Sequence, residues 1–174
     1  MYASRAGLKL EYALQEFKID VKGLVCADLG CSTGGFTDCL LQKGAAKVYA
    51  VDTGYGVLDW RLRNDPRVKV MERTNALHVN LPELVDLVTI DVSWTPQRLI
   101  FPKGAVLLKQ GGHIISLIKP HYEAHIAHLT PEESEIIAQK TKNTLCDLGF
   151  EIHGLIKSPV LGEKGGNVEY LVLY

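Results

Sequence analysis

The sequence of 174 residues has no apolar run that approaches the roughly 18 to 20 residues needed by a membrane-spanning helix. Its first ten residues include Arg5 and Lys9 and lack the hydrophobic segment of a signal peptide. We therefore expect a cytoplasmic protein without a membrane partner.

The sequence also lacks an excess of either charge, because 19 basic and 20 acidic residues give a formal net charge of -1. No global positive field is present to attract nucleic acid. Any contact with RNA must therefore depend on a local feature or on another domain.

Metal-binding and disulfide patterns are missing too. The four cysteines form no CxxC pair, which excludes a zinc knuckle and makes a disulfide scaffold a poor interpretation. His121, His125 and His128 have helical spacing, but no adjacent acid or cysteine completes a ligand set. We expect no metal site.

What is present is an alternation of strand-like and helix-like segments, with 47% apolar and 22% charged residues. Length and composition suit one domain over residues 1–174, and the alternation predicts an α/β fold with a parallel sheet. An opening helix from about Ala3 would place Leu8, Tyr12, Leu14 and Phe17 near helical spacing. Further helices are expected from the glycine turn to about Lys43, and over 131–149 after an N-cap at Thr130. The expected strands are 24–28, 47–52, 68–71, 84–91, 113–118, 151–157 and 168–174.

The last two expected strands have no helix-length insert between them. Parallel neighbours need a crossover of about a dozen residues or more, so this pair must be antiparallel. The prediction is a mixed sheet of about seven strands with one reversed strand.

The densest motif is DLGCSTGGFT at 28–37, which follows a strand and opens a helix. Its glycines let the backbone turn sharply and approach a ligand, while the amides at the helix start can bind a carboxylate or hydroxyls. Asp52 ends the next expected strand 22 residues after Gly30, the position of an acid that binds a ribose diol. A tight structural turn is the alternative.

The type of nucleotide ligand follows by exclusion. No GKS or GKT follows the glycines, which excludes a P-loop, and their spacing differs from the GxGxxG of nicotinamide sites. The remaining common ligand is S-adenosylmethionine.

At this point the sequence resembles a known family, the TlyA-type or hemolysin A-like branch of the FtsJ-like ribose 2′-O-methyltransferases. The resemblance covers nearly the whole chain. Its carriers are SRAGLKL at 4–10, the motif at 28–37, VDTGYG at 51–56, ERTN at 72–75, DVS at 91–93, IKP at 118–120 and GNVE at 166–169. It implies a Rossmann-like S-adenosylmethionine-dependent methyltransferase fold.

The resemblance also implies which residues form the site. The Lys-Asp-Lys-Glu catalytic tetrad of the family falls on Lys9, Asp91, Lys119 and Glu169. The residues implied to bind the cofactor are Gly30, Ser32, Thr33, Gly34, Gly35 and Phe36, with Asp52 at the ribose, Asn75 near the adenine and Asp91 at the shared pocket. For Asn75, a plain turn role is equally compatible with the sequence.

Physical chemistry supports the transfer of the tetrad. Asp91 and Lys119 each end an apolar strand, where an unpaired charge is costly. We expect Lys119 to be the general base for a ribose hydroxyl, which would require its pKa to fall by about three units, or about 4 kcal/mol, through burial beside Lys9. Asp91 could orient Lys119 or the hydroxyl, and Glu169 could hold Lys9. The plainer alternatives are a solvated Lys9 and a cross-strand charge partner at Glu169.

Two aromatic residues have open roles. Trp60, with Arg61 and Arg63, could contact RNA, although an exposed helix face packed by Trp60 is the plainer interpretation. Trp94, close to Asp91, could form a wall of the substrate pocket or fill core space.

The resemblance points to 2′-O-methylation of ribosomal RNA, of cytidines in 16S and 23S rRNA, with the RNA or ribosomal subunits as partner. Family members usually carry an N-terminal S4 RNA-binding domain, and we expect a single methyltransferase domain here without it. Two alternatives are a hemolysin-like membrane-acting protein, which a liposome-leakage assay would detect, and a catalytically silent scaffold that binds S-adenosylmethionine.

Overall fold

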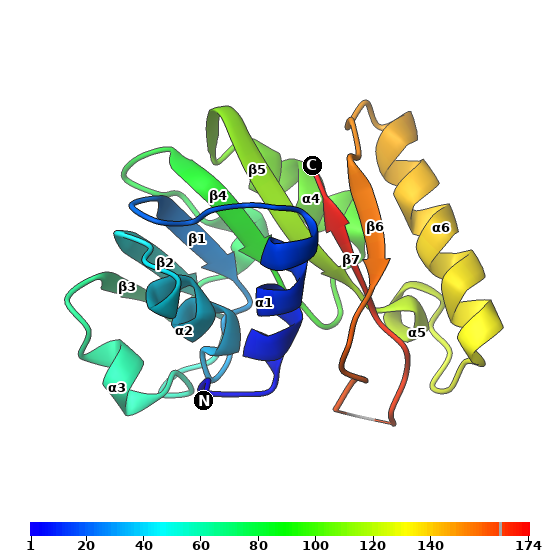
Figure 1. Cartoon of the computed structure of the whole chain (residues 1–174), viewed down its shortest axis with the longest axis horizontal. Coiled ribbons are helices and arrows are strands. Elements are labelled where there is room, and N and C mark those ends of the chain that lie inside the picture. The colour runs from blue at the N-terminus through cyan, green and yellow to red at the C-terminus, as the bar shows by residue number, and fades with distance from the viewer. Residues whose placement is uncertain (164) are drawn as a thin grey trace.

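The computed structural model describes residues 1–163 and 165–174, and within them seven strands form one sheet in the order β3-β2-β1-β4-β5-β7-β6 (Figure 1). The strands are β1 (Val25–Leu29), β2 (Lys47–Val51), β3 (Val68–Met71), β4 (Val85–Ile90), β5 (Leu108–Ile118), β6 (Gly154–Lys157) and β7 (Tyr170–Leu173). Each overlaps a segment that the sequence predicts as a strand, although β5 begins at Leu108, five residues before the expected start at His113. The mixed α/β fold is therefore confirmed.

The direction of the last strands is also confirmed. β1 is parallel to β2 and β4, and β4 is parallel to β5. β7 is antiparallel to both β5 and β6, so it is the reversed strand among the described residues. The short connection from β6 to β7 makes this direction necessary.

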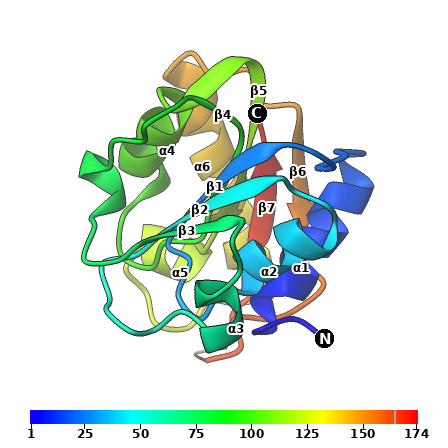
Figure 2. The same ribbon diagram turned by 90° about the vertical axis from the view of Figure 1, so that its left-hand side faces the viewer.

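Helices cover both faces of the sheet, as Figure 2 shows. α1 (Ala6–Glu16) and α2 (Gly35–Gln42) pack together on one face, while α4 (Gln97–Ala105) and α6 (Pro131–Asp147) pack together on the other. Each side has its own apolar core, one around Leu10 and Leu40 and the other around Phe101 and Leu145. The short helices α3 (Trp60–Arg63) and α5 (Pro120–Glu123) and the 3-10 turn η1 (Ala76–His78) complete the fold.

Where α6 begins is confirmed in detail. Thr130 is the N-cap, its hydroxyl accepts a hydrogen bond from the Glu133 amide, and the Glu133 carboxylate accepts one from the Thr130 amide. This reciprocal capping box satisfies two amides that would otherwise lack partners.

Two details of the helices differ from the prediction. The face of α1 that packs on the core carries Leu10, Ala13 and Leu14, together with Lys9, whereas Leu8 is 47% exposed. Of the apolar residues expected near helical spacing, Leu14 therefore lies in the core whereas Leu8 does not. α4 was not predicted, because Pro102 and Gly104 interrupt its apolar pattern.

The order of the strands reverses at β1, which is the topological switch point of the sheet. The chain passes from β1 outward to β2 and β3, then returns to place β4 on the other side of β1. In such sheets, ligands bind beyond the carboxyl ends of the strands at this switch point. Within the described ranges, we find no helix with the length and apolar character required to cross a membrane.

Candidate active site

The turn from β1 into α2 needs glycine at two positions for different reasons. Gly30 has φ +87°, and a Cβ there would lie 2.5 Å from the backbone oxygen of Asp91 at the end of β4. Gly34 has φ +100° and is the N-cap of α2. Left-handed backbone and close approach of the β4 backbone both favour glycine.

The buried side chain of Asp28, in β1 just before the turn, connects β1 to α2 and β4 by hydrogen bonds. Thr37 donates a hydrogen bond of 2.7 Å to its Oδ2, and Thr89 donates one of 3.0 Å to its Oδ1. Complete burial raises the pKa of Asp28 to about 7, although the two hydroxyl donors oppose that rise. The sequence prediction did not list Asp28 as a site residue, yet its place at a strand end before the glycines was a signal.

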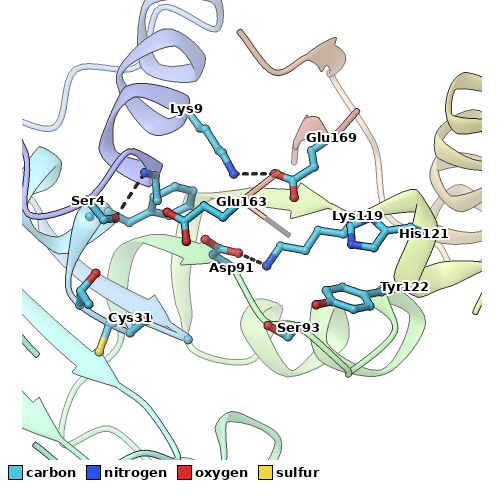
Figure 3. Close-up of a pocket in the computed structure, with 16 residues that line it drawn as sticks. Ser4, Lys9, Cys31, Asp91, Ser93, Lys119, His121, Tyr122, Glu163 and Glu169 are labelled. Carbon is cyan, nitrogen blue, oxygen red and sulfur yellow. Dashed lines mark hydrogen bonds and ion pairs between the residues drawn. The ribbon is translucent and has the colours of Figure 1, made fainter. Parts of the chain in front are cut away.

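A pocket of about 290 Å³ lies above this turn, between α1, β4 and β5 (Figure 3). Ten of its lining residues are Gly30, Ser32, Thr33, Gly35, Phe36, Asp91, Lys9, Lys119, Glu169 and Ser4. The structure thus brings the predicted tetrad and six of the nine predicted cofactor residues to one cavity. Gly34, Asp52 and Asn75 do not line it.

Asp52 lies directly beyond β2 and is tied to the glycine turn. Its Oδ2 accepts a hydrogen bond of 2.8 Å from the Ser32 amide, and its Oδ1 accepts one of 2.8 Å from the Gly54 amide. A carboxylate has about four acceptor positions, so capacity for hydroxyl donors remains.

Asn75 has a structural contact. It is the N-cap of η1, where its side-chain oxygen accepts a hydrogen bond of 2.9 Å from the Leu77 amide. Its side chain therefore performs the turn role that the sequence left open.

The tetrad forms two ion pairs, each drawn in Figure 3. Lys9 Nζ lies 2.6 Å from Glu169 Oε2, with side chains 6% and 3% exposed. Lys119 Nζ lies 2.6 Å from Asp91 Oδ1, with side chains 14% and 18% exposed. Lys9 comes from α1 and Glu169 precedes β7, so the first pair joins segments 160 residues apart.

These contacts exclude the plainer interpretations of two residues. A solvated Lys9 is wrong, because the side chain is buried. A cross-strand partner for Glu169 is also wrong, because its partner lies on a helix.

The charge on Lys119 differs from the expectation. Burial disfavours its ammonium form, but the carboxylates of Asp91 and Glu169 outweigh that effect and raise the pKa of Lys119 above its usual value. The expected lowering of its pKa by Lys9 was wrong for the free protein, because Glu169 neutralises Lys9. Burial also raises the pKa of Glu169, against the opposing charges of Lys9 and Lys119.

Both tryptophans are exposed on the surface. Trp94 is 79% exposed and its ring centroid lies 4.8 Å from that of Tyr122, a pocket residue that the sequence prediction missed. The interpretation of Trp94 as core filling is therefore wrong. Trp60 is exposed on α3, which agrees with its interpretation as part of an exposed helix face.

The three histidines do not share a helix. His121 lies in α5, but that helix ends at Glu123, before His125 and His128. Over residues 1–163 and 165–174, no group of three or more His, Cys, Asp or Glu side chains is arranged to hold a metal ion.

With the fold and the pocket defined, comparison with known proteins identifies the family. The sequence pattern that defines the FtsJ-like methyltransferases matches residues 2–174. The chain belongs to the FtsJ-like methyltransferase family.

Named relatives of this FtsJ-like chain agree with the resemblance. YqxC of Bacillus subtilis, provisionally named an rRNA methyltransferase, is 41% identical over 98% of this chain and 64% of its own length. TlyA of Mycobacterium tuberculosis, named a 16S/23S rRNA (cytidine-2′-O)-methyltransferase, is 39% identical over 98% of this chain and 67% of its own length. Hemolysin A of Brachyspira hyodysenteriae is 40% identical over 98% of this chain and 75% of its own length. The chain thus spans about two thirds of YqxC and TlyA.

Solved structures show the same fold. A protein of Lactococcus lactis, provisionally named a hemolysin, has 41% identity and a TM-score of 0.91, covering 99% of this chain and 87% of that one. Fibrillarin of Aeropyrum pernix, solved with natively bound S-adenosyl-L-methionine, has 24% identity and a TM-score of 0.67, covering 95% of this chain and 74% of that one. The FtsJ-like chain therefore has a methyltransferase fold.

Proposed function

We propose that this chain transfers a methyl group from S-adenosylmethionine to a ribose 2′-hydroxyl of ribosomal RNA, with rRNA or ribosomal subunits as its partner in the cytoplasm. The observation that carries the proposal is the convergence of Lys119 and Asp91, 2.6 Å apart, in the same pocket as the glycine turn. The names of the relatives support cytidines of 16S and 23S rRNA as targets.

The residues around the pocket fit the cofactor. Gly30 and Gly35 line it, and so do Ser4 and Ala6, which pack directly against Gly35 where a Cβ would collide with both. Bound there, S-adenosylmethionine would supply an electrophilic methyl group on its sulfonium. The backbone of the glycine turn would bind the methionine end, and the unused lone pairs of Asp52 would accept bonds from ribose hydroxyls.

The ion pair beside the turn supplies the proton chemistry. Methyl transfer to a hydroxyl requires the loss of its proton, and Lys119 Nζ is positioned to accept it while Asp91 orients the pair. In the free protein Asp91 and Glu169 favour the ammonium form of Lys119. A positive charge that enters the pocket favours the neutral amine, so Lys119 becomes a base only in the loaded site.

Trp94 and Tyr122 form an aromatic wall beside this pair. Lys119 Nζ lies 5.8 Å from the centroid of the Tyr122 ring, and the Trp94 ring centroid lies 4.8 Å from the same centroid. We assign this wall to the substrate side of the pocket, because Tyr122 lies across the pocket from Cys31 in the glycine turn (Figure 3).

The test is methyl incorporation from labelled S-adenosylmethionine into unmodified ribosomal subunits. Lys119→Ala should abolish transfer, while calorimetry should show that cofactor binding persists. Lys140→Ala, which changes an exposed lysine on α6, is the matched control and should remain active. Full activity of Lys119→Ala would refute the base assignment, and a wild-type chain that binds cofactor without any transfer would instead be a silent scaffold.

A further inference from the structure

The segment 52–63 forms the outer wall of the glycine turn. At its start, the Asp52 carboxylate accepts a hydrogen bond from the Ser32 amide, and further along the Asp59 amide donates one of 3.1 Å to the Thr33 carbonyl. Leu58 and Leu62 pack over Gly34, where a Cβ would collide with both side chains. The position of this segment therefore determines the shape of the turn.

Residues 52–59 have no regular helix or strand of their own. Backbone hydrogen bonds attach only their beginning to the segment that follows β3: the Thr74 amide donates to the Asp52 carbonyl at 2.9 Å, and the Arg73 amide donates to the Gly54 carbonyl at 3.1 Å. Those bonds precede the part that lies against Gly34. In the middle of the segment the Arg73 guanidinium lies 4.2 Å from the centroid of the Tyr55 ring, and one further contact joins Gly56 to the residues after β3.

The Glu72 side chain makes that contact. Its Oε1 accepts a hydrogen bond of 2.9 Å from the Gly56 amide and also contacts Arg63 Nη2 at the end of α3. The Glu72 side chain is 7% exposed, so water competes little for these bonds. One carboxylate oxygen thus joins the middle of the segment to its end.

Glu72 does not line the pocket, and the sequence prediction gave it no role beyond its place in the ERTN motif. Without the carboxylate, the Gly56 amide loses its acceptor and the Arg63 guanidinium loses its buried counter-charge. The segment 54–59 could then shift relative to the glycine turn. Binding groups must be held to within about half an ångström, so such a shift would weaken binding at the turn.

We propose that Glu72 is a positioning residue for the methyl donor, which fixes segment 52–63 against the glycine turn without touching the ligand. The proposal rests on the proposed function, because it requires that S-adenosylmethionine binds at this turn.

The experiment measures the dissociation constant for S-adenosylmethionine by calorimetry for the wild type, Glu72→Gln and Glu72→Ala. Loss of a charge-assisted hydrogen bond predicts a weakening of about tenfold or more for Glu72→Ala. Glu72→Gln keeps an oxygen that accepts from Gly56, so it should weaken binding by a smaller factor. In the free protein, hydrogen exchange of the amides in 52–59 should be faster in both variants.

The kinetic constants distinguish a positioning role from general destabilisation, because a positioning role changes KM for S-adenosylmethionine but not kcat. At a temperature where the variants are folded, KM for S-adenosylmethionine should rise, whereas kcat at saturation and the affinity for ribosomal subunits should stay within about twofold of wild type. Glu83→Ala is the matched control, because Glu83 also accepts two bonds, from Lys47 and Tyr49, at the opposite end of β2. It should leave the dissociation constant unchanged.

The outcomes separate the two proposals. A wild type that binds S-adenosylmethionine, with Glu72→Ala binding equally well, would overturn the role of Glu72 alone. A wild type that does not bind S-adenosylmethionine would overturn the proposed function and this inference together. If Glu72→Ala does not fold, Glu72→Gln decides, and wild-type affinity with unchanged hydrogen exchange would refute the role.

Discussion

Replacement of Lys9 by methionine tests the buried ion pair that joins α1 to β7. The two charged atoms lie 2.6 Å apart and both side chains are almost fully buried, so Lys9→Met leaves the Glu169 carboxylate buried without its partner. Breaking a buried pair in this way costs about 3 to 5 kcal/mol. This is a large part of the stability of about 5 to 15 kcal/mol that a domain usually has.

The loss of unfolding free energy caused by Lys9→Met should depend on pH, and the pKa of Glu169 determines whether the loss grows or shrinks as the pH rises. Burial already holds the pKa of Glu169 above its usual value, and removal of the Lys9 charge raises it further. A group whose pKa is raised by folding contributes stability at low pH that is lost as the pH rises through its folded pKa. The variant should therefore be closest to wild type near pH 5 and furthest from it near pH 8.

The assay is urea unfolding at both pH values. Lys9→Met/Glu169→Gln removes the unpaired charge and should recover most of the lost stability. The control is Lys43→Met, whose partner Glu11 on α1 is also 2.6 Å away but whose pair is 36% and 29% exposed. Such a surface pair is worth about 1 kcal/mol or less. Equal unfolding free energies for Lys9→Met and Lys43→Met would refute the buried-pair reasoning.

Two further predictions concern the glycine turn. The folded pKa of Asp28 is about 7, above its usual value, so the protonated carboxyl should contribute stability below about pH 4 that is lost as the pH rises through about 7, at most about 4 kcal/mol. Asp28→Asn should make the unfolding free energy depend less on pH between pH 4 and 8. An unchanged dependence on pH would contradict this. Gly30→Ala should lower unfolding free energy by more than the 1 to 2 kcal/mol of left-handed strain, because its Cβ would meet Asp91. Gly23→Ala has similar φ and open space, so urea unfolding should show strain alone, and equal losses would exclude the collision.

The strands were predictable because each one is marked by an apolar run within a few consecutive residues of the sequence. β3 was predicted with the observed bounds, and the reversed direction of β7 followed from the length of a connection. α4 was hidden because proline and glycine lie within nine residues of helix. Local patterns therefore predicted the sheet better than its covering helices.

The sequence predicted most of the residues that line the pocket, but it did not predict the electrostatics of their side chains. A lysine on an amphipathic helix is usually solvated, and only Glu169, 160 residues away, explains why Lys9 is buried. The direction of the Lys119 pKa likewise depends on two carboxylates that come together only in the folded chain. Glu72 was hard to recognise because its effect passes through Gly56 and Arg63.

The two ion pairs differ in a way that assigns different roles to the two lysines. Lys9 and Glu169 are more deeply buried, so separating them is costly, and they fix α1 beside β7. Lys119 and Asp91 are more exposed and face the pocket, where an incoming hydroxyl can reach them. Asp91 and, less strongly, Glu169 favour the ammonium form of Lys119 in the free protein. The proposed role of Lys119 as a base is compatible with its raised pKa in the free protein, because the proposal assigns the neutral amine to the state with bound S-adenosylmethionine.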